Sequence, residues 1–198
     1  DILTGGKTFK DFILGVHGVL NIENALAAFA VALTSGISPD KIRSALASYN
    51  GVKRRFEIIL HNEKVLYIDD YAHHPEELKA FITSVRDAVP GKRISGIFQP
   101  HLYTRTRDFA DSFSKSLSLL DDVILLEIYP AREEPISGVN SRMIFEKLNN
   151  SGEKVLCGKE QIFKVIEELN PVVLLTMGAG DIDQVVDPVK ELLTRMNP

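Results

Sequence analysis

Two short stretches of the chain concentrate side chains that could take part in chemistry. The first, residues 67–78, reads YIDDYAHHPEEL and places two aspartates beside a tyrosine and two histidines. The second, residues 97–109, reads IFQPHLYTRTRDF and adds a third histidine, another tyrosine and two arginines. Aspartate suits a ribose hydroxyl or a magnesium-bound water, whereas arginine offers a planar fork of donors for carboxylate or phosphate. Together these residue types indicate a site for a charged ligand of about nucleotide size.

Each cluster also has a purely structural interpretation. Asp69 or Asp70 could cap the following helix, and Pro75 suits a first helical turn whose acidic residues favour the helix dipole. The histidines could be partly buried loop residues, and the arginines could form surface ion pairs with Asp108 and Asp111. We favour a binding site because three histidines and two tyrosines fall in two neighbouring loops.

Apolar periodicity indicates which elements position these residues. After residue 51, short uninterrupted apolar runs alternate with segments whose apolar residues recur at helical spacing. This alternation predicts an α/β fold: a doubly wound, mostly parallel, Rossmann-like sheet with helices on both faces. The expected strands are a hairpin over 54–70 with its turn at His61-Asn62, then 93–99, 122–128, 154–158 and 172–177. The expected helices are 75–89, 106–120, 140–149, 159–169 and 181–196.

The first fifty residues have a different character. TGGK, near the start, reads as a hairpin turn, and the pattern after it predicts a strand over 8–16 and helices over 21–36 and 39–49. Gly36 suits a helix end, and Pro39 suits a first helical position. We place a domain boundary near Gly51, which divides the chain into residues 1–50 and 51–198.

The predicted topology brings the polar loops together. Ligands of open parallel sheets bind outside the carboxyl ends of the strands, where loops converge and helix N-termini point their free N–H groups outward. DDYAHHP, QPHLYTRTR, YPAREEP and GAGD each follow a predicted strand. We therefore expect all four loops on one edge of the sheet, where they would form a common site.

Composition limits the classes of function. The chain has 198 residues, of which 44% are apolar and 25% charged, and its net charge of −4 offers no general attraction for nucleic acid. No apolar run is long enough to span a bilayer, and no signal-peptide pattern is present. Cys157 is the only cysteine, so no intramolecular disulfide can form. We expect a cytoplasmic protein without nucleic-acid or membrane partners.

Five motifs, in this order and at this spacing, resemble the C-terminal portion of the Mur ligase family. They are GVKRRFE, DDYAHHPEE, FQPHLYTRTRDF, YPARE and GAGDI. The likeness runs over nearly the whole chain. The PHxYTRTR pattern is more specific than the shared DYAHxP pattern, and it is typical of the branch that adds the first amino acid in peptidoglycan synthesis.

The resemblance implies an ATP- and Mg²⁺-dependent ligase that adds L-alanine to UDP-N-acetylmuramate through an acyl phosphate. It implies that residues 1–50 are the end of a central ATP-binding domain and that residues 51–198 are the complete C-terminal domain. The partners would then include the rest of the same chain, its N-terminal and central domains. In the intact enzyme the C-terminal domain would close over the central one, with a hinge at Asn50-Gly51.

The resemblance also assigns roles to individual residues. The nucleotide would be contacted by Asn21, Asn24, Arg55 and Asp70, the last on the ribose. The muramyl-alanine side would be contacted by Tyr71, His73, His101, Tyr103 and Arg105, with Arg105 as the carboxylate clamp. No residue of this chain is assigned as a nucleophile, as a general acid or base, or as a metal ligand.

Two positions depart from the family pattern. Leu20 stands where GxHNxxN usually has histidine, which removes a contact with adenine. Leu102 stands where PHRYTRTR has its first arginine, which leaves Arg105 and Arg107 to carry the charge.

A larger departure is the missing phosphate loop. The family holds triphosphate on a GTxGKT loop, and these 198 residues contain no such motif. We therefore expect that this polypeptide alone does not catalyse ligation. Three alternatives stay open: a metal-dependent hydrolase using Asp69, Asp70, His73 and His101, a stand-alone nucleotide-binding dehydrogenase, and the related ligase that recycles a whole tripeptide. A dehydrogenase of that kind should carry a glycine fingerprint after its first strand, and this chain has none.

Overall fold

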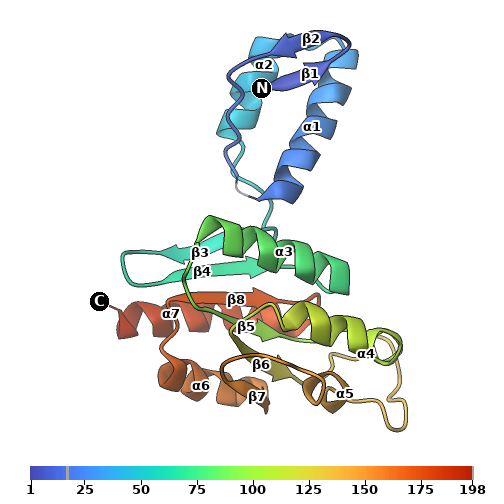
Figure 1. The fold of residues 1–198 in the computed structure, drawn as a ribbon, viewed down its shortest axis with the longest axis vertical. Coiled ribbons are helices and arrows are strands. Elements are labelled where there is room, and N and C mark those ends of the chain that lie inside the picture. The colour runs from blue at the N-terminus through green and yellow to red at the C-terminus, as the bar shows by residue number, and fades with distance from the viewer. Residues whose placement is uncertain (17, 198) are drawn as a thin grey trace. The chain divides into compact units, whose positions relative to one another are not determined.

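A computed structural model describes residues 1–16 and 18–197, apart from the side chain of Leu20. The chain forms two compact units, Asp1–Lys53 and Arg54–Pro198. Each unit is described by itself below (Figure 1). Among the described residues, no helix combines the length and the apolar character that a membrane crossing requires.

The first unit contains a small hairpin and two helices. Strands β1 (Ile2–Thr4) and β2 (Lys7–Phe9) pair antiparallel, with Thr4 opposite Lys7. Gly5 and Gly6 form the two-residue turn with φ of 54° and 71°, which glycine adopts without a steric penalty. The expected TGGK hairpin turn is confirmed. The expected strand over 8–16 is wrong in extent, because β2 ends at Phe9 and residues 10–16 have no strand pairing.

Two helices complete this unit. They are α1 (Val19–Thr34) and α2 (Pro39–Ser48), close to the predicted ranges. Gly36 follows α1 with φ of 82°, and Pro39 is the first residue of α2. Phe29 is buried and packs edge-on against Phe9 and Phe12, with ring centroids 5.2 Å apart in both pairs.

The second unit is built on a six-stranded sheet with the order β3-β4-β8-β5-β6-β7. Only the β3–β4 pair is antiparallel; the other pairs are parallel. The strands are β3 (Glu57–His61), β4 (Leu66–Asp70), β5 (Ile94–Phe98), β6 (Asp122–Leu126), β7 (Lys154–Cys157) and β8 (Val173–Met177). The predicted α/β class and mostly parallel sheet are therefore confirmed.

Helices cover both faces of the sheet. One apolar cluster joins the sheet to α3 (Pro75–Ala88), α4 (Tyr103–Leu117) and α5 (Arg142–Phe145). A second joins the opposite face to α6 (Ile162–Leu169) and α7 (Val186–Met196). Alternate residues of β8 face opposite clusters: Leu175 belongs to the first and Leu174 to the second. Burial on both faces explains why the central strands read as uninterrupted apolar runs.

Several helix limits differ from the sequence-based expectations. The helix expected over 140–149 is only Arg142–Phe145, although Leu148 beyond it is still buried. The helices expected over 159–169 and 181–196 each begin with a 3-10 turn, η1 (Lys159–Gln161) and η2 (Asp181–Val185). Helix α4 begins at Tyr103, three residues earlier than expected, so Tyr103 and Arg105 lie in its first turn.

Candidate functional site

The four polar loops meet at the carboxyl edge of the sheet, as the sequence predicted. Strands β4, β8, β5 and β6 are neighbours in that order and run parallel. In Figure 1 the arrowheads of β4 and β8 point to the same side of the unit. The loops that leave these strands carry Tyr71 and His73, the Gly178 turn, His101, and Tyr129 respectively.

A continuous series of contacts links five side chains along this edge. The Arg55 guanidinium lies 5.4 Å from the Tyr71 ring centroid, and the Tyr71 ring lies 5.2 Å from that of His73. The His73 ring lies 6.1 Å from that of His101, and Nη1 of Arg105 lies 3.4 Å from Nδ1 of His101. We call these five residues the rim series. Their imidazole and guanidinium groups converge, so the edge presents cations and aromatic rings together.

His101 is held by the loop that follows β6. The backbone of His101 forms an isolated parallel β-bridge with Tyr129, and the two rings stack with centroids 5.8 Å apart. The Leu102 amide donates to the Tyr129 carbonyl at 3.0 Å, and the Tyr129 amide donates to the Pro100 carbonyl at 2.8 Å. Leu102 has φ of 74°, an uncommon value for a residue other than glycine. These bonds hold the strained residue and fix the direction of the neighbouring imidazole.

The electrostatic surroundings of His101 favour its neutral form. Partial burial lowers the pKa of His101 below its ordinary value of 6.5, and the positive charges of Arg105 and His73 lower it further. A neutral imidazole can accept a hydrogen bond at Nδ1. At 3.4 Å from the Arg105 guanidinium, that bond is long and weak, and a ligand could compete for the arginine donors.

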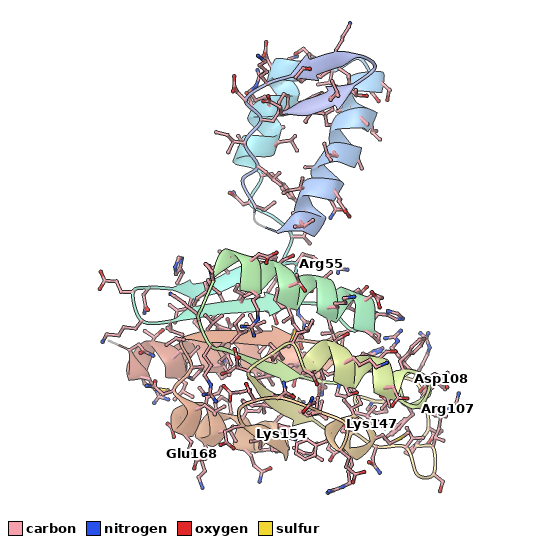
Figure 2. The ribbon with its side chains drawn as sticks, in the orientation of Figure 1. Arg55, Arg107, Asp108, Lys147, Lys154 and Glu168 are labelled. Atoms are coloured by element: carbon pink, nitrogen blue, oxygen red, sulfur yellow. The ribbon has the colours of Figure 1, made fainter. Side chains whose placement is uncertain are left out.

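Helix α4 carries Tyr103 and Arg105 on its first turn, and the YPARE loop holds that turn. The Glu133 carboxylate accepts hydrogen bonds from the Thr104 amide at 2.9 Å and from the Thr104 hydroxyl. These two bonds, the Tyr103 amide and the charge of Arg105 lower the pKa of Glu133 below its ordinary value, against the raising effect of desolvation. Arg107 instead pairs with Asp108 at 2.7 Å, both half exposed and side by side in Figure 2. The charge next to His101 therefore comes from Arg105.

His73 and His74 immediately precede α3, and His74 is its N-cap residue. Oε2 of Glu77 accepts the amides of His73 at 2.9 Å and His74 at 3.1 Å, which closes a capping box. The His73 ring nitrogen Nδ1 lies 3.0 Å from the Tyr71 carbonyl. The His74 ring turns to Phe109, with centroids 5.0 Å apart. Only His73 of the two histidines belongs to the rim series.

Sequence reasoning missed the role of Arg54, because nothing in its type distinguishes it from Arg55. Nε of Arg54 donates to Oδ2 of Asp69 at 2.9 Å, and Nη2 donates to the Gly178 carbonyl at 2.6 Å. Asp69 is 1% exposed and also accepts the Thr176 hydroxyl at 2.6 Å. Burial raises the pKa of Asp69, while Thr176 and Arg54 lower it; with two donors, the carboxylate form fits this geometry.

Asp70 is buried and already has hydrogen-bond partners. Its Oδ2 accepts the Phe56 amide and its Oδ1 the Ala72 amide, both at 2.8 Å. Burial raises its pKa, against the lowering effect of these two amides and of Arg55. Each carboxylate oxygen keeps a second lone pair, so the expected ribose contact remains a prediction. Among the described residues, no group of three or more histidine, cysteine, aspartate or glutamate side chains is placed to hold a metal ion.

The GAGD turn completes the edge. Gln99 donates to Asp181 at 2.8 Å and accepts the Ile182 amide at 3.0 Å, which fastens this turn to the end of β5. A Cβ atom at Gly180 would lie 2.6 Å from Oε1 of Gln99 and 2.7 Å from Cβ of Tyr129. Glycine is therefore required here for close approach of the backbone to its neighbours.

The two asparagines expected at the nucleotide lie in the first unit. Asn21 and Asn24 are one turn apart on α1; Asn21 is partly buried and Asn24 is exposed. Spacing of three residues places both on one face of the helix. The contact expected to be lost at Leu20 concerns a side chain outside the described part of the structure. The other departure, Leu102, is partly buried beside the rim series.

Comparison with known proteins gives consistent matches. The family model "Mur ligase, glutamate ligase domain" matches residues 54–180. A UDP-N-acetylmuramate--L-alanine ligase of Parabacteroides distasonis is 51% identical over 185 residues, which cover 93% of this chain and 40% of that protein. One of Phocaeicola vulgatus with the same name is 50% identical over 200 residues, covering 96% and 44%.

A solved structure agrees with these matches. The crystal structure of the UDP-N-acetylmuramate-alanine ligase of Thermotoga maritima is 30% identical with a TM-score of 0.80, covering 97% of this chain and 42% of that chain. A murein peptide ligase of Psychrobacter arcticus, 23% identical with a TM-score of 0.63, shares the fold. This chain thus spans about two fifths of the length of the curated relatives described above.

Proposed function

The chain belongs to the Mur ligase family, and on that premise we propose that it supplies the C-terminal part of an ATP-dependent ligase that joins L-alanine to UDP-N-acetylmuramate in peptidoglycan synthesis. In this reaction ATP phosphorylates the lactyl carboxylate, and the amine of L-alanine attacks the acyl phosphate. The amide, ADP and phosphate are then released. A cytoplasmic location for this reaction remains a prediction.

The rim series is the observation that carries this proposal. Acyl-phosphate chemistry depends on positioning the reactants and neutralising transferred charge more than on a protein nucleophile. Arg55 and Arg105 stand at the two ends of a continuous row of rings, Tyr71, His73 and His101. Two planar cationic groups separated by aromatic side chains suit two anionic groups, one at each end of the row.

We assign the proposed contacts by the side of the site that each residue occupies. Arg55 and Asp70 would face the nucleotide, together with Asn21 and Asn24 of the first unit. Tyr71, His73, His101, Tyr103 and Arg105 would face the muramyl-alanine side. Arg105 is the proposed carboxylate clamp, because its long contact with His101 leaves its other donors for a ligand.

ATP and Mg²⁺ would be held mainly by segments of the ligase other than these 198 residues. The exposed guanidinium of Arg55 fits a phosphate or ribose-phosphate group. The edge does not fit a magnesium ion, since arginines flank its carboxylates and the described residues form no ligand cluster. We derive no step of the reaction through the metal. The phosphate-loop function is accordingly assigned outside this chain, and the chain alone is proposed to be inactive.

The first unit supports the division into two domains that we propose at residue 50. Of its described hydrophobic residues, Phe29 and Ile42 are buried, whereas Leu3, Ile13 and Val31 are 76%, 71% and 66% exposed. So much exposed apolar surface is typical of a piece that packs against more of the same domain. We propose that residues 1–50 end the central ATP-binding domain and that residues 51–198 are the C-terminal domain.

A chimeric enzyme tests the proposed function. The matching segment of the Parabacteroides distasonis relative is replaced by residues 1–198, and ADP release is measured with and without L-alanine and UDP-N-acetylmuramate. We expect ADP release that depends on both substrates. Arg105→Gln should abolish most of it, whereas Lys115→Gln, an exposed charge change later in α4, should not. A folded chimera that binds ATP but never responds to L-alanine would overturn the proposal.

Two further measurements test the finer points. The 198-residue chain by itself should release no ADP in the same assay, and alanine-dependent release from it would refute its proposed inactivity. Replacing L-alanine by an L-alanyl tripeptide distinguishes the tripeptide-recycling alternative, for which the tripeptide would be the better substrate.

A further inference from the structure

Arg55 lies between two residues with unusual backbone conformations. Arg54 has φ of 61° and Phe56 has φ of 50°, and neither is a glycine. Such left-handed conformations are uncommon for residues with a side chain, and bulky residues adopt them only where surrounding contacts hold them. The segment 54–56 is therefore set by its anchors rather than by local preference.

The first anchor is Arg54, whose hydrogen bonds reach three other segments. Its side chain donates to Asp69 of β4 and to the Gly178 carbonyl after β8. Its amide donates to Glu57 at 2.7 Å, and its carbonyl accepts the Tyr71 amide at 2.8 Å. The Arg54 side chain is 13% exposed and that of Asp69 is 1% exposed. Solvent screens the attraction between two charges this buried only slightly, so the ion pair holds the Arg54 side chain firmly in place.

The second anchor is Phe56. Its amide donates to Oδ2 of Asp70 at 2.8 Å, and its ring packs edge-on against Phe81 with centroids 5.5 Å apart. The two neighbouring aspartates thus accept hydrogen bonds from the residues on either side of Arg55: Asp69 from Arg54, and Asp70 from Phe56. Arg55 itself is exposed, and its guanidinium lies 5.4 Å from the Tyr71 ring centroid (Figure 2 labels Arg55).

We propose that Arg54 is a positioning residue, which through its buried ion pair with Asp69 and its bond to Gly178 holds the backbone that presents the Arg55 guanidinium over the Tyr71 ring. The inference rests on the proposed function where it assigns Arg55 to the nucleotide. The two arginines of RRFE then have separate roles. Arg55 binds the ligand, and Arg54 holds Arg55 in place.

Arg54→Lys is the informative variant because it keeps a positive charge next to buried Asp69. A lysine ammonium cannot reproduce the planar fork that reaches Asp69 and Gly178 together. In the chimeric ligase we expect this variant to raise the KM for ATP by about tenfold, the factor that losing one charge-assisted hydrogen bond corresponds to. The kcat should change less, within about twofold. Lys53→Gln, the exposed neighbouring cation, is the control and should leave both constants unchanged.

A double-mutant cycle separates positioning from a general effect on the fold. If Arg54 acts through Arg55, then Arg54→Lys should change KM by less than about twofold when Arg55→Gln is already present. Melting temperatures of all variants are measured in parallel. Effects of the two substitutions that multiply independently would overturn the proposal, because a merely structural role predicts additive free energies.

The isolated 198-residue chain gives a test that does not depend on ligase activity. The Nε–H signal of Arg55 should carry a ring-current shift from Tyr71 in its NMR spectrum. We expect Arg54→Lys to move this signal toward its value in an unstructured peptide, while Lys53→Gln leaves it in place. An unchanged Arg55 signal in a folded Arg54→Lys chain would overturn the positioning role, even if the chimera proved inactive and the proposed function failed.

Discussion

Nδ1 of His101, in the loop before α4, lies 3.4 Å from Nη1 of Arg105, in the first turn of that helix. Two cations at that distance would repel each other. The arrangement is stable because burial and the charge of Arg105 hold the pKa of His101 below 6.5. A neutral His101 is thus part of the rim series.

The titration of His101 gives the first prediction. Removing the charge in Arg105→Gln should raise the pKa of His101 toward, but not to, 6.5, because burial remains. Lys115→Gln, further along α4, should leave it unchanged. Imidazole proton shifts followed by NMR measure both variants. A pKa of His101 that does not respond to Arg105 would contradict the electrostatic contact.

The same shift has a consequence for stability. The folded pKa of His101 lies below its unfolded value of about 6.5, so the unfolded chain binds the proton first as pH falls. The contribution of neutral His101 is therefore complete above about pH 6.5 and is lost as pH drops through the lower folded pKa.

The capping box of α3 gives the second prediction. Partial burial alone would raise the pKa of Glu77, but the His73 and His74 amides and the charge of His73 lower it below 4.5. Ionised Glu77 therefore stabilises the fold above about pH 4.5, and this contribution disappears as pH falls through the folded pKa. Glu77→Gln should cost about 0.5–1 kcal/mol at pH 7.

Urea unfolding of Glu77→Gln at several pH values measures this cost. Glu76→Gln is the matched control, since Glu76 is exposed in the same first turn but accepts neither histidine amide. Equal losses for the two variants would show that the helix dipole and not the capping box is responsible. A cost for Glu77→Gln that persists well below pH 4 would show that the contribution does not depend on the ionised carboxylate.

The contact between Glu133 and Thr104 gives the third prediction. The glutamate joins the YPARE loop to the start of α4, where Arg105 is presented. Glu133→Gln should destabilise this turn, as the loss of a helix cap does. Amide hydrogen exchange of residues 103–106 should accelerate, while Glu134→Gln, an exposed neighbour, should leave it unchanged. Uniform acceleration over all helices would argue against a local effect.

The α/β alternation was predictable because parallel strands buried on both faces must be apolar throughout. The position of the four loops on one edge was also predictable, because the carboxyl ends of parallel strands lie at the same edge of a sheet. The position of β8 between β4 and β5 was not predictable, since the local pattern of a strand does not specify its neighbours. That position matters here because it brings Gly178 within reach of Arg54.

The individual site residues were harder to separate from sequence. Arg54 and Arg55 are the same residue type, and only the left-handed backbone at Arg54 and Phe56 turns one inward and leaves the other exposed. No glycine marked that turn. The early start of α4 was missed for the same reason, because Leu102 has positive φ without the residue type that signals it.

Gly180 gives the last prediction, and it isolates steric effects at the site edge. Its φ of −86° is ordinary for any residue, so Gly180→Ala introduces no backbone strain. The new Cβ would lie 2.6 Å from Oε1 of Gln99 and 2.7 Å from Cβ of Tyr129. Gln99 also holds Ile182 and Asp181, so it cannot move without losing both hydrogen bonds. We expect destabilisation of about 1–3 kcal/mol, typical of an overpacked position.

Gly158→Ala is the control for this prediction. Gly158 also has negative φ, of −80°, and also follows a parallel strand. The atoms that its Cβ would meet are Oε2 of Glu160 at 2.9 Å and Oε1 of Gln161 at 3.9 Å, the far ends of flexible side chains that can turn away. This variant should stay within about 0.5 kcal/mol of the unsubstituted chain. Urea midpoints for the two alanine variants decide the matter: equal midpoints would mean that Gln99 and Tyr129 yield, and that the GAGD turn is not clamped at the edge of the sheet.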